Sequence, residues 1–206
     1  MTMIDPNEWV RAFAELIEQH TDELTALDAA IGDADHGSNL RRGTSAVVET
    51  LADAAPGSAA EQLKQVGMTL IRTVGGASGP LYGSFFLGCA TALGDKKLDT
   101  TDFAAAFRGG LDKVVARGKA ELGDKTMFDA LAPAADELDR RLAAGDSLAA
   151  ALDAATTAAE DGSDATIPML ARKGRASYLG ERSVGHRDPG AASAALLVLA
   201  AWRAAQ

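Results

Sequence analysis

Residues 5–17 read DPNEWVRAFAELI, and this stretch indicates how the chain folds. Asp5 and Pro6 supply the capping side chain and the backbone angle that begin a helix, and Glu8 follows three residues after the cap. The next apolar residues recur on one helical face: Trp9, Phe13, Leu16 and Ile17. The sequence therefore predicts an amphipathic helix that runs to about Thr25.

The same spacing recurs along most of the chain and predicts about eight helices. Ser58 and Glu61 have the spacing of a capping box, Thr100 or Thr101 precedes another apolar helix, and Asp188-Pro189 repeats the first cap. The remaining segments with helical spacing are 40–51, 59–74, 81–93, 100–115, 127–144, 148–155, 167–172 and 189–205.

The overall pattern is typical of an all-α protein. Runs of β-branched and aromatic residues with a period of two are absent, so no strand is expected. No Pro- or Ser-rich linker divides residues 1–206, which we expect to form a single domain. The connections are short enough for neighbouring helices to run antiparallel.

Composition and charge disfavour several classes of protein and binding partner. The 206 residues are 47% hydrophobic and carry a net charge of −9, which disfavours nucleic acids and anionic membranes as partners. The longest apolar stretch, 191–202, is shorter than the ~20 residues that span a bilayer. The N-terminus has no signal-peptide pattern, and Cys89 is the one cysteine, so we expect a cytoplasmic protein.

An acidic loop follows the first predicted helix. Residues 27–39 read LDAAIGDADHGSN and place Asp28, Asp33 and Asp35 within eight positions. Oxygen ligands without thiolates suit Mg²⁺ or Ca²⁺, and Mg²⁺ is commonly shared between carboxylates and substrate phosphates. A calcium-binding EF-hand is excluded, because Thr44 stands where that loop needs an acid. The alternative is a solvated acidic turn.

Three further loops are rich in glycine and polar residues: 75–83, 118–126 and 174–190. Residues 75–80, GGASGP, allow a close backbone approach, and the helix start that follows offers N–H groups to an anion. This stretch is not a Walker P-loop, because it lacks the Lys-Ser/Thr pair and a preceding strand. The alternative is a tight corner between two helices.

No catalytic nucleophile is visible, but phosphoryl transfer needs only positioning and charge neutralisation. His36 can be a phosphoryl carrier, a metal ligand, a hydrogen-bond donor to phosphate or a turn residue without a role. Among the basic residues near the four loops, we expect Arg175 to serve the site, because it stands among glycines in the fourth loop.

These motifs together resemble the ADP-binding, L-type subunit of dihydroxyacetone kinase. The resemblance rests on four stretches in the family's order: 27–37, 75–83, 118–127 and 174–190. It implies an eight-helix antiparallel barrel with the nucleotide held by loops at one end. One mild departure is Asn39-Leu40, where Asn-Met is expected.

The resemblance also implies the ligand contacts. Asp28, Asp33 and Asp35 would bind two Mg²⁺ ions that grip the diphosphate of ADP or ATP. Contacts to the phosphates would come from His36, Gly37, Ser38, Asn39, Ala77 and Ser78. The adenosine would be surrounded by Gly118, Thr126, Met127, Arg175, Asp188, Pro189 and Gly190.

In this family, bound ADP acts as a cofactor: a phosphohistidine carrier protein of the phosphotransferase system rephosphorylates it. The phosphoryl group then passes to dihydroxyacetone on a separate K-type subunit. The resemblance thus implies a transferase subunit that needs these partners, and it suggests a homodimer. The alternatives are an ATP-exchanging kinase subunit for dihydroxyacetone or a related ketose, and a nucleotide-sensing regulatory module.

Overall fold

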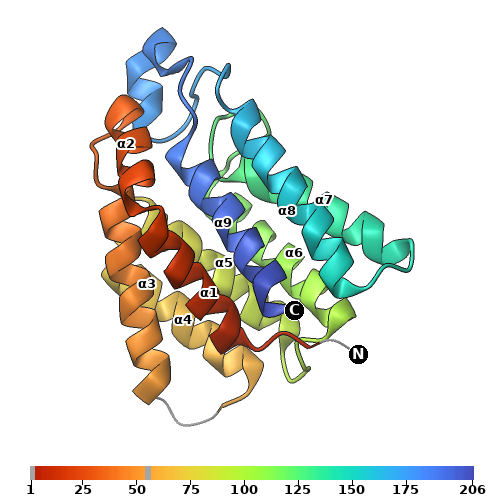
Figure 1. Ribbon diagram of the computed structural model, residues 1–206. Coiled ribbons are helices and arrows are strands. Elements are labelled where there is room, and N and C mark those ends of the chain that lie inside the picture. Colours follow the sequence, from red (N-terminus) through yellow and green to blue (C-terminus); the bar gives the residue numbers. More distant parts are fainter. Residues whose placement is uncertain (1–2, 54–56) are drawn as a thin grey trace.

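The helices close into a ring in the computed structural model, which describes residues 3–53 and 57–206 (Figure 1). The described residues form nine α-helices and one 3-10 helix, η1. In chain order these are α1 (Pro6–Gln19), α2 (Thr21–Ile31), α3 (His36–Asp53), α4 (Ala59–Thr73), α5 (Ser78–Leu93), α6 (Thr100–Gly118), α7 (Phe128–Ala143), α8 (Leu148–Ala165), η1 (Arg175–Ser183) and α9 (Pro189–Ala204).

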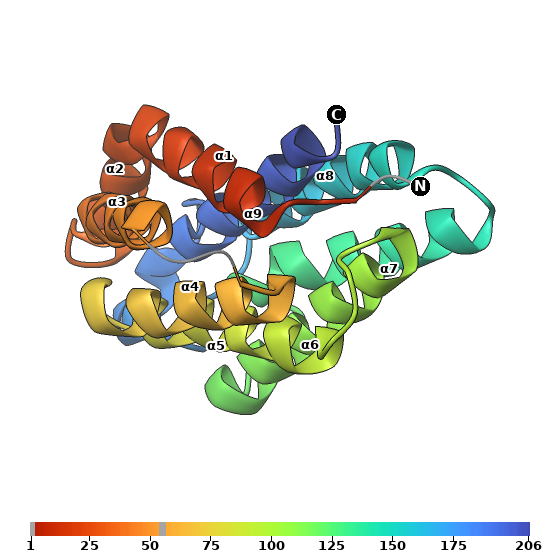
Figure 2. The same cartoon turned by 90° about the horizontal axis from the view of Figure 1, so that it is seen from below.

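Eight of these helices form an up-and-down barrel. From α3 to α9, leaving η1 aside, each α-helix packs against the next in the chain, and α9 packs back against α1, which contacts α3 (Figure 2). The ring therefore has no open edge. The predicted all-α fold and the eight-helix barrel are confirmed, with α2 and η1 as additions at one end.

Several helix starts follow the predicted capping rules. Asp5 accepts a hydrogen bond from the Asn7 N–H, and Asp188 accepts one from the Ala191 N–H. Ser58 and Glu61 form the complete capping box. The prediction of Thr100 or Thr101 as a cap is wrong: the carboxylate of Asp99 accepts from the N–H groups of Thr101 and Asp102 instead, at 3.2 and 3.1 Å.

The predicted boundaries differ in three places. The first helix breaks at His20, whose φ of −106° and ψ of 11° allow α2 to leave the axis of α1 and pack over α3 and η1. Residues 167–169 form a turn and a bend, and 170–172 are irregular, so the predicted helix is absent there; part of the expected polar loop is η1. The sequence Ala55-Pro56-Gly57 predicts an end for the helix over 40–51, but residues 54–56 lie outside the described residues. Pro133, at which a helix is expected to kink or to begin, lies inside α7.

The centre of the barrel is aromatic although aromatic residues are few. Trp9 of α1 lies 5.4 Å from Phe86 and 5.3 Å from Phe103 between ring centroids, and Phe85 lies 5.2 Å from Phe107. The buried Trp9 indole donates a hydrogen bond of 3.0 Å to the Leu197 carbonyl of α9. This bond joins the first and last helices where the ring closes.

Glycines allow the closest helix contacts. A Cβ on Gly88 of α5 would meet the Gly109 carbonyl and lie 2.8 Å from the Gly110 Cα, both in α6. A side chain there would push two backbones apart, because interiors are packed too densely to absorb it. The close packing of α5 against α6 therefore requires a residue without a side chain at Gly88.

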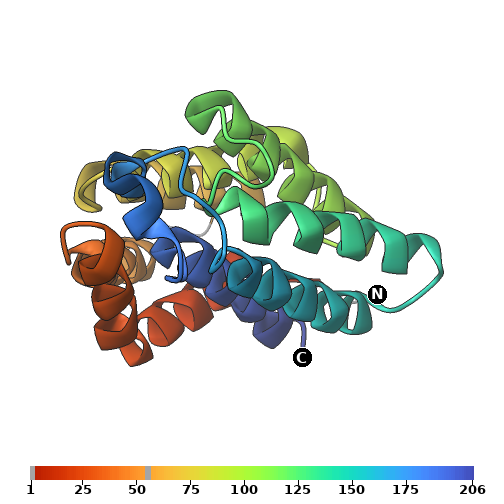
Figure 3. The same ribbon diagram turned by 90° about the horizontal axis from the view of Figure 1, so that it is seen from above.

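Helix alternation determines where the site lies. The connections that follow α2, α4, α6 and α8 meet at one end of the barrel, which Figure 3 views from above. The connections that follow α3, α5 and α7 lie at the other end. None of the helices in the described part of the chain is long and apolar enough to cross a membrane.

We predict that Gly88→Ala lowers the free energy of unfolding by about 1–3 kcal/mol, because overpacking separates α5 from α6. Urea unfolding followed by circular dichroism measures the change. Thr91→Ala is the matched control on the same helix, since Thr91 is exposed, and should change stability by less than about 0.5 kcal/mol. Equal stability of the Gly88 variant and the wild type would contradict the packing argument.

Candidate functional site

The four loops singled out in the sequence enclose one cavity of about 510 Å³. Its lining residues lie at the end of the barrel that carries η1 and residues 118–127. Figure 3 views this end of the barrel from above. One part of its wall is acidic and polar. The other part is largely apolar and includes Ile31, Leu81, Val114, Ala120, Met127, Ala176 and Pro189.

The three predicted metal-binding carboxylates converge at this cavity. Asp28, Asp33 and Asp35 each offer an oxygen, and these oxygens lie within 4.8 Å of one another. Asp28 is buried at the end of α2, and its Oδ2 accepts hydrogen bonds from the N–H groups of Asp35 (2.8 Å) and His36 (3.2 Å). One carboxylate thus holds the loop and the start of α3 in place.

The backbone of this loop is constrained at two points. A Cβ on Gly32 would collide with Oδ1 of Asp28. Ala34 has a φ of 62°, in the left-handed region that costs an L-residue roughly 1–2 kcal/mol. Strain of this kind is typical of loops whose side chains must point to a fixed place.

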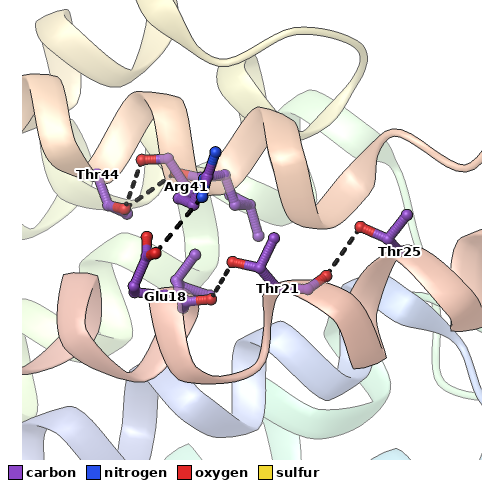
Figure 4. A network of polar contacts seen from close by, with 7 residues as sticks. Glu18, Thr21, Thr25, Arg41 and Thr44 are labelled. Atoms are coloured by element: carbon purple, nitrogen blue, oxygen red, sulfur yellow. Dashed lines mark hydrogen bonds and ion pairs between the residues drawn. The ribbon is translucent and has the colours of Figure 1, made fainter.

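Helix α3 packs against α1 and α2 near the bend between them (Figure 4). A Cβ on Gly37 would meet the Thr21 carbonyl, so glycine is needed for the approach of the two helices. The hydroxyls of Thr21 and Thr25 each donate to the backbone carbonyl four residues earlier. The Arg41 guanidinium of α3 donates to the Glu18 carboxylate of α1 at 3.4 Å. Gly37 therefore has a packing role and does not line the cavity.

The glycine turn presents a free helix start to the cavity. No side chain caps α5, and the same is true of α2 and α7, whereas α1, α4, α6, α8 and α9 each have an Asp or Ser cap. Gly76 has a φ of 66°, and Gly75 leaves space in which a Cβ would lie 2.9 Å from the Asn39 amide oxygen. Free N–H groups and the helix dipole at such a start attract an anion.

His36 lies between two hydroxyl groups. Its Nδ1 is hydrogen-bonded to Ser78 Oγ (3.1 Å) and its Nε2 to Ser193 Oγ (2.8 Å), which also contacts the Tyr82 hydroxyl (2.7 Å). Burial lowers the pKa of His36, although Asp28 and Asp35 act in the opposite direction. A neutral ring, with one donor and one acceptor nitrogen, fits this position.

Arg175 connects the fourth loop with the acidic loop. Its Nη2 lies 2.9 Å from Oδ2 of Asp33, and both residues line the cavity. The pair is solvent-exposed, with the Arg175 side chain 67% accessible, so it contributes little to stability. Arg175 is the one basic residue that sequence reasoning assigned to the site, and the structure places it at the cavity.

Lys125 and Asp188 are charged residues whose burial was not expected. Lys125 is 1% exposed, with a pKa lowered by burial, and its Nζ faces backbone carbonyls of the connection between α8 and α9. Burial raises the pKa of Asp188 to about 7; nearby Asp129 adds to the shift, and Lys125 and the Ala191 N–H oppose it. A lysine in a Gly-Asp-Lys-Thr turn gives no sequence signal for burial.

The structure brings most of the predicted site residues to the cavity wall. Those that line it are Asp28, Asp33, Asp35, His36, Ala77, Ser78, Gly118, Thr126, Met127, Arg175, Asp188, Pro189 and Gly190. Gly37, Ser38 and Asn39 do not line it. Ser38 is exposed and donates to the Asp35 carbonyl, and Asn39 accepts from Arg42.

We predict a specific pH dependence from Asp188. Its folded pKa of about 7 exceeds the unfolded value of ~3.9, so the folded state binds the proton more tightly between these values. This contribution to stability is present below pH ~4 and is lost as the pH rises through 7. Asp188→Asn keeps an oxygen for the Ala191 N–H but cannot titrate.

Urea unfolding of the wild type and Asp188→Asn at pH 5 and pH 8 tests this. The stability of the wild type relative to the variant should fall as the pH rises. The same pH response in both proteins would show that Asp188 does not titrate in this range.

The sequence profile of the DAK2 domain matches residues 30–203. The chain is 48% identical over 186 residues to the "PEP-dependent dihydroxyacetone kinase, ADP-binding subunit DhaL" of Escherichia coli, covering 90% of this chain and 89% of that protein. It is 38% identical over 188 residues to "D-erythrulose kinase" of Mycolicibacterium smegmatis, covering 90% of this chain but only 32% of that longer protein.

A solved structure shares the fold. The dihydroxyacetone kinase from C. freundii, in complex with AMP-PNP and Mg²⁺, matches with a TM-score of 0.70 and 27% identity, over 94% of this chain and 32% of that one. Both the profile and the E. coli relative extend over nearly the whole chain. The chain therefore belongs to the DAK2-domain family, with the ADP-binding subunits of dihydroxyacetone kinase among its relatives.

Proposed function

We propose that this chain is the nucleotide-holding subunit of a phosphoenolpyruvate-dependent dihydroxyacetone kinase. The observation that carries the proposal is the convergence of three carboxylates and an uncapped helix start on one cavity. The E. coli relative named as an ADP-binding subunit supports the same function. The reaction is a phosphoryl transfer, in which the protein supplies position and charge.

The acidic loop is the proposed magnesium site. Asp28, Asp33 and Asp35 offer hard oxygen ligands, the donor set that Mg²⁺ prefers, and the cavity leaves space for a diphosphate beside them. Bound magnesium supplies charge neutralisation between phosphate oxygens. The Asp28 carboxylate is oriented by two backbone N–H groups, so the chain fixes one ligand before any ion arrives.

The start of α5 is the proposed phosphate site. Ala77 and Ser78 line the cavity where the free N–H groups of the helix begin, close to the acidic loop. His36 holds the Ser78 hydroxyl, and the ring is itself held by Ser193. We assign Gly37, Ser38 and Asn39 the role of shaping the loop and helix behind these contacts, because they do not line the cavity.

The apolar part of the cavity is the proposed adenosine site. It brings together Gly118, Thr126 and Met127 from the third loop with Arg175 from η1. The turn Asp188-Pro189-Gly190 faces them from the start of α9. Apolar walls with a few fixed polar groups are typical of sites for a flat aromatic ligand.

The proposed reaction needs partner subunits. A phosphohistidine carrier protein would phosphorylate the bound ADP, and a K-type subunit would hold dihydroxyacetone. We further propose that residues 1–206 form a single domain, that two copies form a homodimer and that the protein works in the cytoplasm.

The second candidate is a kinase subunit that exchanges ATP freely and acts on dihydroxyacetone or a related ketose. The relative named D-erythrulose kinase favours this alternative. Both candidates use the same cavity, so they differ in how long the nucleotide stays bound. A nucleotide-sensing regulatory module is a third possibility, and activity with a K-type partner would exclude it as the sole function.

We predict that Asp33→Asn weakens Mg²⁺-dependent ADP binding at least about tenfold, since a charged metal ligand is lost. The helical fold should persist, and in metal-free buffer the variant should be at least as stable as the wild type, because like-charge repulsion is relieved. Calorimetric titration with ADP and Mg²⁺ measures the affinity. Asp22→Asn, an exposed acid at the start of α2, is the control; undiminished ADP affinity of the Asp33 variant would overturn the metal assignment.

The two candidate functions predict different amounts of bound nucleotide in the purified protein. The protein is purified with Mg²⁺ and denatured, and the released nucleotide is quantified. Near-stoichiometric ADP is expected if the nucleotide is a retained cofactor fed by a phosphohistidine protein. An empty protein that binds ATP and ADP reversibly would instead favour the second candidate.

A further inference from the structure

The ammonium group of Lys125 lies inside a ring of backbone oxygens. Its Nζ donates to the carbonyls of five residues, at 2.9, 3.4, 3.2, 2.7 and 2.5 Å: Thr166, Ile167, Met169, Ser183 and His186. The side chain is 1% exposed, although its backbone adopts the left-handed φ of 64°. A buried lysine without a carboxylate partner in contact is rare, because burying a charge is costly.

These five carbonyls come from separate parts of the connection between α8 and α9, which contains the fourth loop. Thr166, Ile167 and Met169 belong to the turns after α8, Ser183 ends η1, and His186 precedes the cap of α9. Three other hydrogen bonds connect these parts: the Gly185 N–H donates to the Ile167 carbonyl (2.8 Å), the Ala171 N–H to Ser183 Oγ (3.0 Å) and the Asp188 N–H to Thr166 Oγ1 (2.9 Å). Each of these bonds joins two of the stretches, whereas the Lys125 ammonium contacts all three at once.

The connection between α8 and α9 forms one wall of the cavity, and the backbone around Lys125 forms another. Lys173, Gly174, Arg175 and the turn 188–190 line the cavity from the connection between α8 and α9, while 125–127 line it from the connection between α6 and α7. The hydrogen bonds of the Lys125 ammonium do not reach the acidic loop or the start of α5, and the acidic loop meets this wall at the ion pair between Asp33 and Arg175. The ring of carbonyls thus acts on the apolar part of the cavity.

We propose that Lys125 is a positioning residue whose ammonium serves as a tethered monovalent cation, holding the third and fourth loops together as the two walls of the adenosine site. Five acceptors surround three N–H donors, which fits a cation better than a neutral amine. Rings of carbonyl oxygens also bind K⁺ by replacing its hydration shell. An untethered cation of similar size should therefore replace the lysine, and this inference rests on the proposed function.

The test compares two variants. Lys125→Ala removes three methylene groups and the amine and leaves the carbonyl ring empty, so ADP should bind about 10- to 100-fold more weakly in Tris buffer. Addition of K⁺ or n-propylammonium should restore most of the affinity. Lys125→Met is the matched control, because its uncharged chain fills the space; it should lose affinity and gain nothing from either cation.

A second readout separates positioning from general damage. Mn²⁺ binding at the acidic loop, followed by electron paramagnetic resonance, and helix content by circular dichroism should be unchanged in both variants. Wild-type ADP affinity in Lys125→Ala without added cation, or a loss that neither cation reverses, would overturn the inference. Loss of both Mn²⁺ binding and ADP binding in Lys125→Ala would also overturn it. Failure of the wild type to bind ADP would instead count against the proposed function.

Discussion

Closure of the helix ring is the constraint on which the rest of the structure depends. The Trp9 indole bonds to the Leu197 carbonyl in the buried core, so the first and last helices are joined by a directional bond as well as by packing. With the ring closed, alternate connections are forced to the same end. The topology of the barrel therefore brings four loops that are far apart in the sequence to the same end, whether or not the loops contact one another.

At that end, the chain builds polar geometry from backbone groups. The Asp28 carboxylate is fixed by N–H groups, the start of α5 offers N–H groups, and Lys125 is surrounded by carbonyls. Backbone groups are positioned by the fold itself and lose little entropy when they bind. This arrangement suits a site that must hold several charges close together.

Local signals made the helices and the loop chemistry predictable. The caps at Asp5, Ser58 and Asp188 and the apolar spacing gave the helices, and the spacing of three aspartates gave the acidic cluster. The break at His20 and the helix η1 were missed, because both follow from packing between distant segments. Lys125 was missed for the same reason: its acceptors lie more than forty residues away.

The alternation of the loops also decides how this chain can be joined to another protein. α1 begins and α9 ends at the end of the barrel that faces away from the cavity. A helix of 19 residues such as α6 is about 28 Å long at 1.5 Å per residue. A domain fused to either helix would need a linker of at least about eight extended residues to reach the cavity mouth. Short fusions at these helix ends should therefore leave the nucleotide end of the barrel open to partners in solution.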